Sequence, residues 1–334
     1  MKIKKNTKIL ITGGSGYIGS CLASFLSRNY EILTIDKIRK SKFVNRKINH
    51  KVVDLKNKSR IDKIFKIFNP NIVIHLAGQS TIDMVKKKKL YYDNNYLATK
   101  NLIEVVKKFK TPNLIFSSTA AVYKKRNFKI EEISKLHSSN SYGNSKIKCE
   151  NIIRKLNTKT TKFCILRFFN VSSSYVEDKV GEYHNPETHL IPLIINSIYK
   201  KKKIFIYGNN YKTKDGTCFR DYIHILDILY GIKKSIQYLK KKHTKSEIFN
   251  LGSGKCFSVY QIIKTCFKIS KLETEILIKN KRRHDVDYLQ CDINKARKLL
   301  KWKPKFSNLK KIIKDEIWWY KYLKYKNLKR KYYY

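Results

Sequence analysis

Three glycines at three-residue spacing lie between a short apolar stretch and a helical stretch near the start of the chain. This feature constrains the fold more than any other. The apolar stretch is Lys8–Thr12, and the glycines are Gly13, Gly16 and Gly19. Only 12 of the 334 residues are glycine, so this spacing rarely arises by chance. Because glycine has no Cβ, such a loop turns tightly and lets a pyrophosphate approach backbone N–H groups at a helix N-terminus. The pattern predicts a strand–loop–helix unit that binds a dinucleotide.

A carboxylate at the end of the next apolar strand supports this interpretation. The strand is predicted over Glu31–Ile35, and Asp36 follows it, 20 residues after Gly16. A carboxylate in this place accepts hydrogen bonds from the ribose hydroxyls of the adenosine. Because it would repel a 2′-phosphate, the sequence favours NAD over NADP.

Apolar strands alternate with helical patterns through the first half of the chain. The clearest helical patterns are Tyr96–Phe109 and Ser145–Leu156. The alternation is typical of βαβ units, so we expect an α/β fold with a Rossmann-type, doubly wound parallel sheet. Further short buried strands are predicted at Val52–Val53, Ile72–Leu76, Leu114–Ser117 and Phe163–Arg167.

The pattern loosens after Asn170, where a serine-rich and then proline-containing segment leads into helices mixed with short strands such as Ile204–Tyr207. We therefore expect an NAD-binding domain over residues 1–172 and a smaller mixed α/β substrate domain over residues 173–334. Segments within about 215–255 are expected to pack back on the first domain. From Trp318 onwards tyrosine and lysine alternate, which predicts a frayed terminal helix.

The formal net charge of +49 suggests, taken alone, a protein that binds nucleic acid. However, only 12 of the 74 basic residues are arginine. Nucleic-acid sites rely on arginine for bidentate contacts. We interpret the excess charge as lysine spread over solvated faces, and we predict no specific nucleic-acid partner.

Other sequence features exclude several classes of protein. No apolar stretch reaches the roughly 18 residues of a membrane span. The start, Met1–Lys5, lacks the pattern of a signal peptide. The seven cysteines form no Cys-x-x-Cys pair and the eight histidines no His-x-x-x-His pair, so neither a disulfide framework nor a metal site is predicted. We expect a cytoplasmic protein without a bound metal.

Tyr142 and Lys146 are the candidate catalytic pair, although tyrosines four residues before a lysine are frequent in so lysine-rich a chain. Their context distinguishes them, because Tyr142 opens a helix and Thr119 ends a predicted parallel strand. Ligands of open α/β sheets bind at such strand ends. Lys146 lies on the same helix face as Tyr142. We expect its cation to lower the pKa of the Tyr142 phenol, with the Thr119 hydroxyl completing a proton relay.

Further motifs follow in order along the chain: His75–Gly78, Tyr91–Asn95, Arg167–Asn170, Pro186–Pro192, Asp215–His224 and Phe249–Gly254. Together with the glycine loop and Tyr142–Lys146, they resemble the extended short-chain dehydrogenase/reductase superfamily. Within it, they are most similar to the UDP-galactose (UDP-glucose) 4-epimerases. The resemblance covers roughly residues 8–305. It implies an NAD-binding Rossmann lobe followed by a smaller lobe that binds a sugar nucleotide.

The resemblance also implies roles for individual residues. Thr119, Tyr142 and Lys146 match the catalytic positions. The positions implied to contact NAD are Gly13, Gly16, Tyr17, Ile18, Gly19, Asp36, Asp54, Leu55, Ala77, Asn94, Tyr142, Lys146 and Phe169. The positions implied to line the UDP-sugar are Thr119, Tyr142, Asn170, His189, Leu190, Arg220, Arg283 and Asp285. The arginines suit this ligand, because a guanidinium group can pair with both charges of a pyrophosphate.

The implied activity is the reversible epimerisation of UDP-galactose and UDP-glucose at C4. It proceeds through a 4-keto intermediate, with hydride held transiently on bound NAD, in a homodimer. Dehydratases of the superfamily place Asp-Glu after the catalytic threonine, whereas Thr119 is followed by Ala120 and Ala121. This difference favours a simple epimerase.

Other functions stay open at this point. Leu289, at the position thought to gate C2 substituents, is neither a bulky aromatic nor a small residue. UDP-N-acetylhexosamines and UDP-uronic acids therefore remain alternative substrates. Ser80 stands where the best-known epimerases carry a lysine that contacts the cofactor phosphate. A non-catalytic, RNA-binding protein with a Rossmann fold is the remaining alternative.

Overall fold

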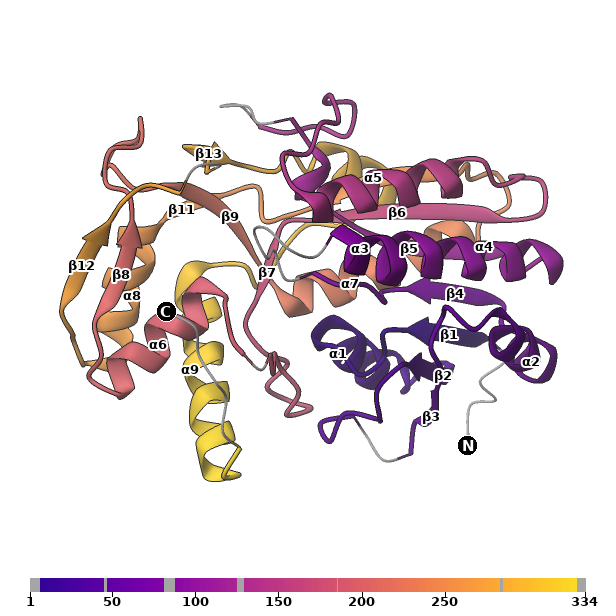
Figure 1. Ribbon diagram of the computed structural model, residues 1–334, viewed down its shortest axis with the longest axis horizontal. Helices are drawn as coiled ribbons and strands as arrows, with labels where there is room; N and C mark the ends of the chain where they lie inside the picture. Colours follow the sequence, from indigo (N-terminus) through magenta and orange to yellow (C-terminus); the bar gives the residue numbers. More distant parts are fainter. Residues whose placement is uncertain are drawn as a thin grey trace.

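The computed structural model describes residues 7–44, 47–80, 88–124, 129–184, 186–282 and 285–328. Seven parallel strands of this part of the chain form a central sheet in the order β10-β6-β5-β4-β1-β2-β3 (Figure 1). The strands are β1 (Lys8–Thr12), β2 (Glu31–Asp36), β3 (Asn49–Val52), β4 (Ile72–His75), β5 (Asn113–Thr119), β6 (Lys162–Phe168) and β10 (Glu247–Leu251). The predicted doubly wound parallel sheet is confirmed. Its strand order reverses between β1 and β4, and ligands of such sheets bind beyond the carboxyl ends of the strands at this reversal.

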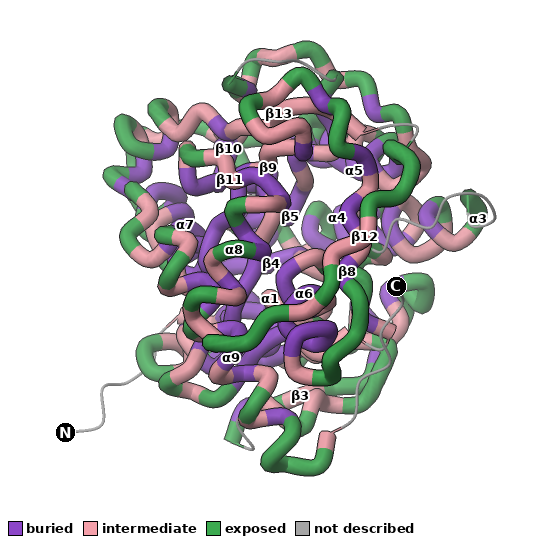
Figure 2. Tube along the Cα trace, turned by 90° about the vertical axis from the view of Figure 1, so that its left-hand side faces the viewer, coloured by how far each residue is buried: buried purple, intermediate pink, exposed green. Residues whose placement is uncertain are grey.

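Helices cover both faces of the sheet, because successive side chains of a strand point to opposite faces. Ile9 and Ile11 of β1 pack in one core with α1 (Tyr17–Leu26) and α7 (Ile225–Leu239). Leu10, between them, packs in a second core on the other face. The helices of this second core are α2 (Lys58–Phe68), α4 (Ala98–Lys108) and α5 (Ser141–Arg154). Figure 2 shows inner strands of the central sheet, such as β4 and β5, as buried segments, whereas β3 at its edge is largely exposed.

The segment before α4 is irregular. A short helix, α3 (Lys88–Tyr91), runs into a π-helix, η1 (Tyr92–Leu97), which leads directly into α4. The sequence predicts one helix from Tyr96, so it places the start of regular helix correctly but misses the π-helical turn before it. π-Helical turns frequently occur at functional sites.

Two smaller sheets and three helices form the remainder of the molecule, on the left in Figure 1. One sheet mixes parallel and antiparallel pairs and contains β7 (Asn170–Ser172), β9 (Phe219–His224), β11 (Cys256–Ser258) and β13 (Tyr288–Leu289). The other pairs β8 (Ile204–Tyr207) with β12 (Ile276–Lys279). A third core joins α6 (Leu190–Tyr199), α8 (Val259–Ser270) and α9 (Leu309–Tyr325). These elements agree with the expected smaller mixed α/β region.

The second half of the chain also contributes to the central sheet. β10 pairs in parallel with β6, and α7 packs against α1. The large sheet is therefore assembled from both halves of the sequence.

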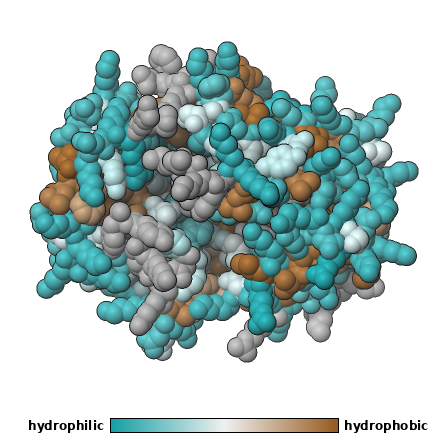
Figure 3. All heavy atoms as spheres, in the orientation of Figure 1, coloured by the Kyte–Doolittle hydropathy of each residue, from teal (hydrophilic) through white to brown (hydrophobic). Residues whose placement is uncertain are grey.

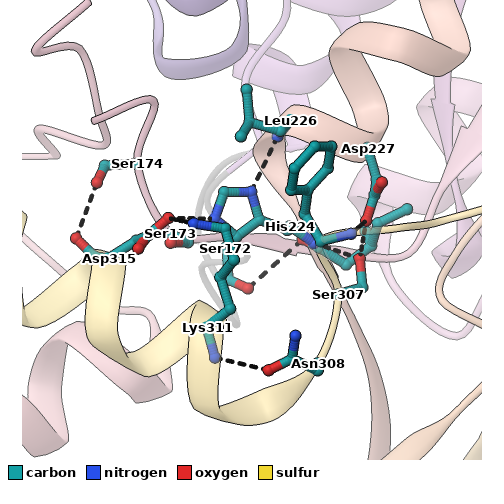
Figure 4. A network of polar contacts seen from close by, with 12 residues as sticks. Ser172, Ser173, Ser174, His224, Leu226, Asp227, Ser307, Asn308, Lys311 and Asp315 are labelled. Atoms are coloured by element: carbon teal, nitrogen blue, oxygen red, sulfur yellow. Dashed lines mark hydrogen bonds and ion pairs between the residues drawn. The ribbon is translucent and has the colours of Figure 1, made fainter. Parts of the chain in front are cut away.

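A buried polar network ties α9 to α7 and β9 (Figure 4). The His224 imidazole lies 3.1 Å from a carboxylate oxygen of Asp315 through Nε2, and its Nδ1 accepts the N–H of Leu226. The Asp227 carboxylate accepts the Ser307 hydroxyl at 2.5 Å, along with two backbone N–H groups of the preceding turn. Asp227 thus anchors the turn that leads into α9.

The terminal helix differs from its prediction. The sequence predicts a frayed helix from Trp318, but α9 continues through this residue to Tyr325. Apolar residues in and before the tyrosine–lysine alternation recur at helical spacing and form one face of α9. On that face Ile312, Trp319 and Leu323 are buried. Packing of this face holds the helix in place.

The surface is dominated by hydrophilic side chains, which cover most of the face in Figure 3. No helix in the described part of the chain is long and apolar enough to cross a membrane.

Candidate active site

The glycine loop joins β1 to α1 and leaves room for a ligand at one of its three positions. Gly13 has a φ of +74°, which favours glycine, and a Cβ on Gly19 would lie 2.0 Å from the Gly13 carbonyl oxygen. These two glycines therefore allow the loop to fold on itself. Gly16, the N-cap of α1, differs, because the nearest atom to a Cβ there is the Gly13 oxygen at 3.4 Å. The Gly16 side of the loop is open, as the approach of a pyrophosphate requires.

Two polar groups nearby fit a dinucleotide. The Asp36 carboxylate ends β2 and accepts the N–H of Ser15 in the glycine loop at 3.1 Å. It is thereby held beside the loop, where a ribose would lie. The amide Nδ2 of Asn94 is buried and has no hydrogen-bond partner within the described structure. A buried donor without an acceptor is costly, and a bound polar cofactor would satisfy it.

The other predicted cofactor residues follow the same edge of the sheet. They lie at the start of α1 (Tyr17, Ile18), after β3 (Asp54, Leu55), after β4 (Ala77) and after β6 (Phe169). The Tyr17 hydroxyl donates to the carbonyl oxygen of Ser173. These residues lie at the same ends of the strands as the open Gly16 position, where a dinucleotide would approach the loop.

Thr119, Tyr142 and Lys146 meet at the carboxyl end of β5. Asn140 caps α5 by accepting the N–H of Gly143 at 2.8 Å, which starts the helix early enough to include Tyr142. Thr119 accepts the N–H of Ala121 at 3.1 Å, and its hydroxyl lies close enough to the Tyr142 phenol to act on its pKa. The buried Lys146 ammonium donates to the Ser117 carbonyl oxygen at 2.9 Å. A tyrosine, a hydroxyl and a cation are therefore assembled at one strand end.

The pKa of Tyr142 differs from the expectation. Burial raises it to about 12, while the hydrogen bond from Thr119 acts in the opposite direction. Burial also lowers the pKa of Lys146. The cost of burying a phenolate exceeds any stabilisation by the neighbouring cation, so the expected lowering is wrong.

A buried ion pair joins the helix that carries Tyr142 and Lys146 to β6, and it was not predicted from the sequence. Arg167 on β6 donates to both carboxylate oxygens of Glu150 on α5, at 2.9 and 2.6 Å, and both side chains are fully buried. The hydroxyl of Ser118, next to Thr119, donates to the same carboxylate at 2.6 Å. Glu150 follows Lys146 by four residues, and a carboxylate at that helical spacing could have been recognised.

Two further buried residues support the site. Both lie in motifs noted in the sequence, although no role was predicted for either. His75, at the end of β4, lies 2.7 Å from the Thr12 hydroxyl and 2.9 Å from the Thr99 hydroxyl. Burial and the Lys146 charge lower its pKa to about 3, so the imidazole is neutral. Asn95 donates to the Ser145 hydroxyl at 2.8 Å, linking η1 to α5. Within the Tyr91–Asn95 motif, a role was predicted for Asn94 only, and the structure shows that its buried neighbour Asn95 supports the site.

The predicted UDP-sugar residues fall into two groups. In the first, Arg220 donates to Asp285 at 2.9 Å and to the Val286 carbonyl oxygen at 2.7 Å. Asn170 donates to the Asp221 carbonyl oxygen at 2.9 Å, so it lies beside Arg220 on paired strands. Leu289 pairs with Arg220 in register. Arg283 lies outside the described residues.

His189 and Leu190 form the second group, at the start of α6. His189 is the N-cap residue, and its Nδ1 lies 2.5 Å from a carboxylate oxygen of Glu182. The charge of Glu182 raises the pKa of His189 to about 9. This group belongs to a loop that includes Glu182 and His184, two residues that the sequence analysis did not select.

Comparison with known proteins agrees with this geometry. Residues 9–252 match the model of the NAD dependent epimerase/dehydratase family. The UDP-glucose 4-epimerase of Halalkalibacterium halodurans is 31% identical over 94% of this chain and 95% of its own length.

Two solved structures are similar over the whole chain. One is the UDP-glucose 4-epimerase of Bifidobacterium longum in complex with NAD⁺ and UDP, with a TM-score of 0.87, 28% identity, and coverage of 97% of this chain and 100% of that one. The other is the UDP-Glc/GlcNAc 4-epimerase of Campylobacter jejuni, with a TM-score of 0.81, 33% identity, and coverage of 95% and 100%. The family match includes the glycine loop, the strand ends and the Tyr142–Lys146 helix, and this chain therefore belongs to the NAD-dependent epimerase/dehydratase family.

Proposed function

We propose that the protein interconverts UDP-galactose and UDP-glucose at C4, with NAD as its cofactor. The observation that carries the proposal is the assembly of Thr119, Tyr142 and Lys146 at the end of β5, beside an open glycine loop. The similarity to UDP-glucose 4-epimerases along nearly the full chain supports the choice of substrate. The Ala120–Ala121 pair after Thr119 supports epimerisation over dehydration, because alanine cannot transfer protons.

The cofactor residues proposed above bind NAD at the carboxyl ends of the strands. Gly13, Gly16 and Gly19 admit the pyrophosphate, and Asp36 accepts the ribose hydroxyls. The remaining proposed contacts are Tyr17, Ile18, Asp54, Leu55, Ala77, Asn94, Tyr142, Lys146 and Phe169. When bound, NAD supplies the oxidation of the sugar C4 and its reversal.

The proton chemistry belongs to Tyr142. Its phenolic oxygen takes the proton of the sugar 4′-hydroxyl in one direction and returns it in the other. The Thr119 hydroxyl lies near this oxygen, where it can orient both the phenol and the substrate. Lys146, held by the Ser117 carbonyl, places a positive charge on the same helix face. Because burial holds the pKa of Tyr142 at about 12, a phenolate near neutral pH requires positive charge close to its oxygen.

Arg220, Asp285, Asn170 and Arg283 are proposed to bind the UDP part of the substrate together with His189 and Leu190. Arg220 provides the main support for this binding site. Its guanidinium is largely buried, with 13% of the side chain exposed, and it is oriented by Asp285 and Val286. An oriented guanidinium group can bind a pyrophosphate through two parallel hydrogen bonds. We also propose that residues 1–172 form the NAD-binding domain and residues 173–334 the UDP-sugar-binding domain, with segments within about 215–255 packing back on the first domain. The pairing of β10 with β6 supports this exception.

A decisive experiment compares the wild type with Tyr142→Phe. The wild type should interconvert the two UDP-sugars and retain NAD on purification. Tyr142→Phe should lose on the order of 10²–10⁴ in kcat, as expected when a general acid–base group is removed. Tyr199→Phe is the matched control, because Tyr199 is also followed by a lysine four residues later but lies on α6, stacked on Tyr320. Equal activity of the two variants would contradict the proposal.

The N-acetylhexosamine substrates form a second candidate. Leu289 is not a bulky aromatic, and the similar Campylobacter jejuni protein is a UDP-Glc/GlcNAc 4-epimerase. Assays with UDP-N-acetylglucosamine and UDP-glucuronate, run beside UDP-glucose, rank the three substrates by kcat/KM. We further propose a cytoplasmic homodimer, for which light scattering gives the mass of the particle.

A further inference from the structure

Four side chains in the loop before α6 converge on one point. Glu182, His184, Glu187 and His189 each offer a nitrogen or oxygen atom, and these atoms all lie within 4.8 Å of one another. We propose that these four residues bind a divalent transition-metal ion of the Zn²⁺ type. The site shares His189 with the proposed substrate-binding residues, but its test reads metal binding and not activity. It departs from the sequence-based expectation that the chain holds no metal.

Both histidines already point at one carboxylate. The Nδ1 atoms of His184 and His189 lie 2.9 and 2.5 Å from the same oxygen, Oε1 of Glu182. The Nδ1 atom of His189 is also 3.6 Å from Oε1 of Glu187. Ligands at Zn–N and Zn–O distances of about 2.0–2.2 Å are spaced roughly 3–4 Å apart around a tetrahedral ion. Small side-chain rotations are enough to convert the observed spacing into a coordination sphere. The ion would then replace the protons that lie between the two histidines and Glu182.

The two carboxylates are held rigidly by their surroundings. Glu182 is 1% exposed and Glu187 is fully buried. The indole N–H of Trp319 donates to the Glu182 carbonyl oxygen at 2.6 Å, and a Cβ on Gly181 would lie 2.7 Å from the same indole. The backbone at this point is therefore pressed against α9, which fixes the main-chain position of Glu182.

Glu187 is fixed by its own helix start. Its Oε1 accepts the backbone N–H groups of Thr188 and His189, at 2.8 and 2.9 Å. Preorganised carboxylates lower the entropy cost of binding an ion, and a buried ligand shell excludes competing water.

The histidines provide both selectivity and access. Their side chains are 35% and 52% exposed, so an ion can reach the carboxylates from solvent. Two imidazoles and two carboxylates form a borderline donor set that suits Zn²⁺, Co²⁺ or Ni²⁺, whereas Mg²⁺ and Ca²⁺ prefer oxygen alone. The chemistry of the donors thus selects the transition metals.

The test uses tag-free, chelator-treated full-length protein titrated with Zn²⁺ and, separately, Mg²⁺ in a calorimeter. We expect one Zn²⁺ per chain and at least a hundredfold weaker binding of Mg²⁺. His184→Ala should weaken Zn²⁺ binding at least tenfold, because it removes one of four ligands. His243→Ala, which removes an exposed histidine outside the cluster, is the matched control and should bind like the wild type. Unchanged Zn²⁺ affinity in His184→Ala would overturn the proposal.

A second measurement covers the case in which cysteines bind the metal instead. Co²⁺ should give visible bands of a nitrogen–oxygen site, without the near-ultraviolet charge-transfer absorption of cysteine ligation. Strong sulfur absorption, or no binding of either ion, would contradict the assignment. Should His184→Ala be poorly folded, His184→Gln serves the same comparison, and a thermal melt with and without Zn²⁺ reports binding without any activity assay. The melting temperature of the wild type, but not of either His184 variant, should rise with Zn²⁺.

Discussion

The substitution Glu150→Gln tests whether the buried ion pair below the catalytic helix stabilises the protein. It keeps the size of the side chain but removes the charge that faces Arg167. Both partners are fully buried, and their two hydrogen bonds are 2.9 and 2.6 Å long. Arg167 keeps the pKa of Glu150 below its usual range even though burial alone would raise it. The carboxylate is therefore ionised in the folded protein.

The size of the expected loss of stability follows from the charge that would remain on Arg167. Removing one member of a buried pair leaves the other uncompensated, at a cost of roughly 3–5 kcal/mol. Arg154, which also pairs with Glu150 but is 42% exposed, adds only about 0.3–0.5 kcal/mol. We expect Glu150→Gln to lower the free energy of unfolding by about 3–5 kcal/mol, measured by urea denaturation at pH 7.

Two further sets of variants test this prediction. Glu104→Gln removes the same charge from a surface pair with Lys58, whose side chains are 39% and 47% exposed. Such a pair contributes about 0–1 kcal/mol, so this control should change stability little. The double variant Glu150→Gln/Arg167→Met removes both charges, and the double-mutant cycle should give a coupling of roughly 1–3 kcal/mol. A loss below about 1 kcal/mol in Glu150→Gln, or additive effects in the cycle, would refute the reasoning.

Two other predictions concern the glycine loop and the response to acid. Gly19→Ala places a Cβ 2.0 Å from the Gly13 oxygen and should lower the free energy of unfolding by about 1–3 kcal/mol. Gly16→Ala meets no such obstacle, so it should alter unfolding by less than about 0.5 kcal/mol yet weaken NAD binding at least tenfold in titrations of the apoprotein. The reverse pattern would contradict an open Gly16 position. His75, with its pKa lowered to about 3, stays neutral in the folded protein as the pH falls below 6.5, whereas the unfolded chain takes up the proton. Stability is therefore lost between pH 6.5 and 3, by about 3 kcal/mol at pH 4, and denaturation of His75→Leu should show an acid-induced loss smaller by this amount.

Local patterns determined most of what the sequence predicted about the fold. β1 and β8 begin and end at the predicted residues, because short apolar runs between turns leave little choice of boundary. Tyr142 was selected from a background of similar tyrosines by its place after a strand end, and the structure puts it next to Thr119. Such features depend on residues near one another in the chain.

Long-range contacts account for what the sequence did not show. The helix of residues 309–325 is ordered because its buried face packs on elements from the middle of the chain, which no local pattern reveals. The Glu150–Arg167 pair joins a helix to a strand, and its importance depends on burial. The raised pKa of Tyr142 also arises from burial, which its spacing from Lys146 cannot indicate.

The pairing of β10 with β6 has a consequence for synthesis on the ribosome. All the other strands of the central sheet precede residue 170, but β10 ends at Leu251. Until that residue has emerged, β6 remains an edge strand with unpaired backbone groups, a known cause of aggregation. A fragment ending near residue 172 would keep this edge permanently. The nascent protein is therefore exposed to edge-to-edge association for longer than the early appearance of its dinucleotide-binding loop would indicate.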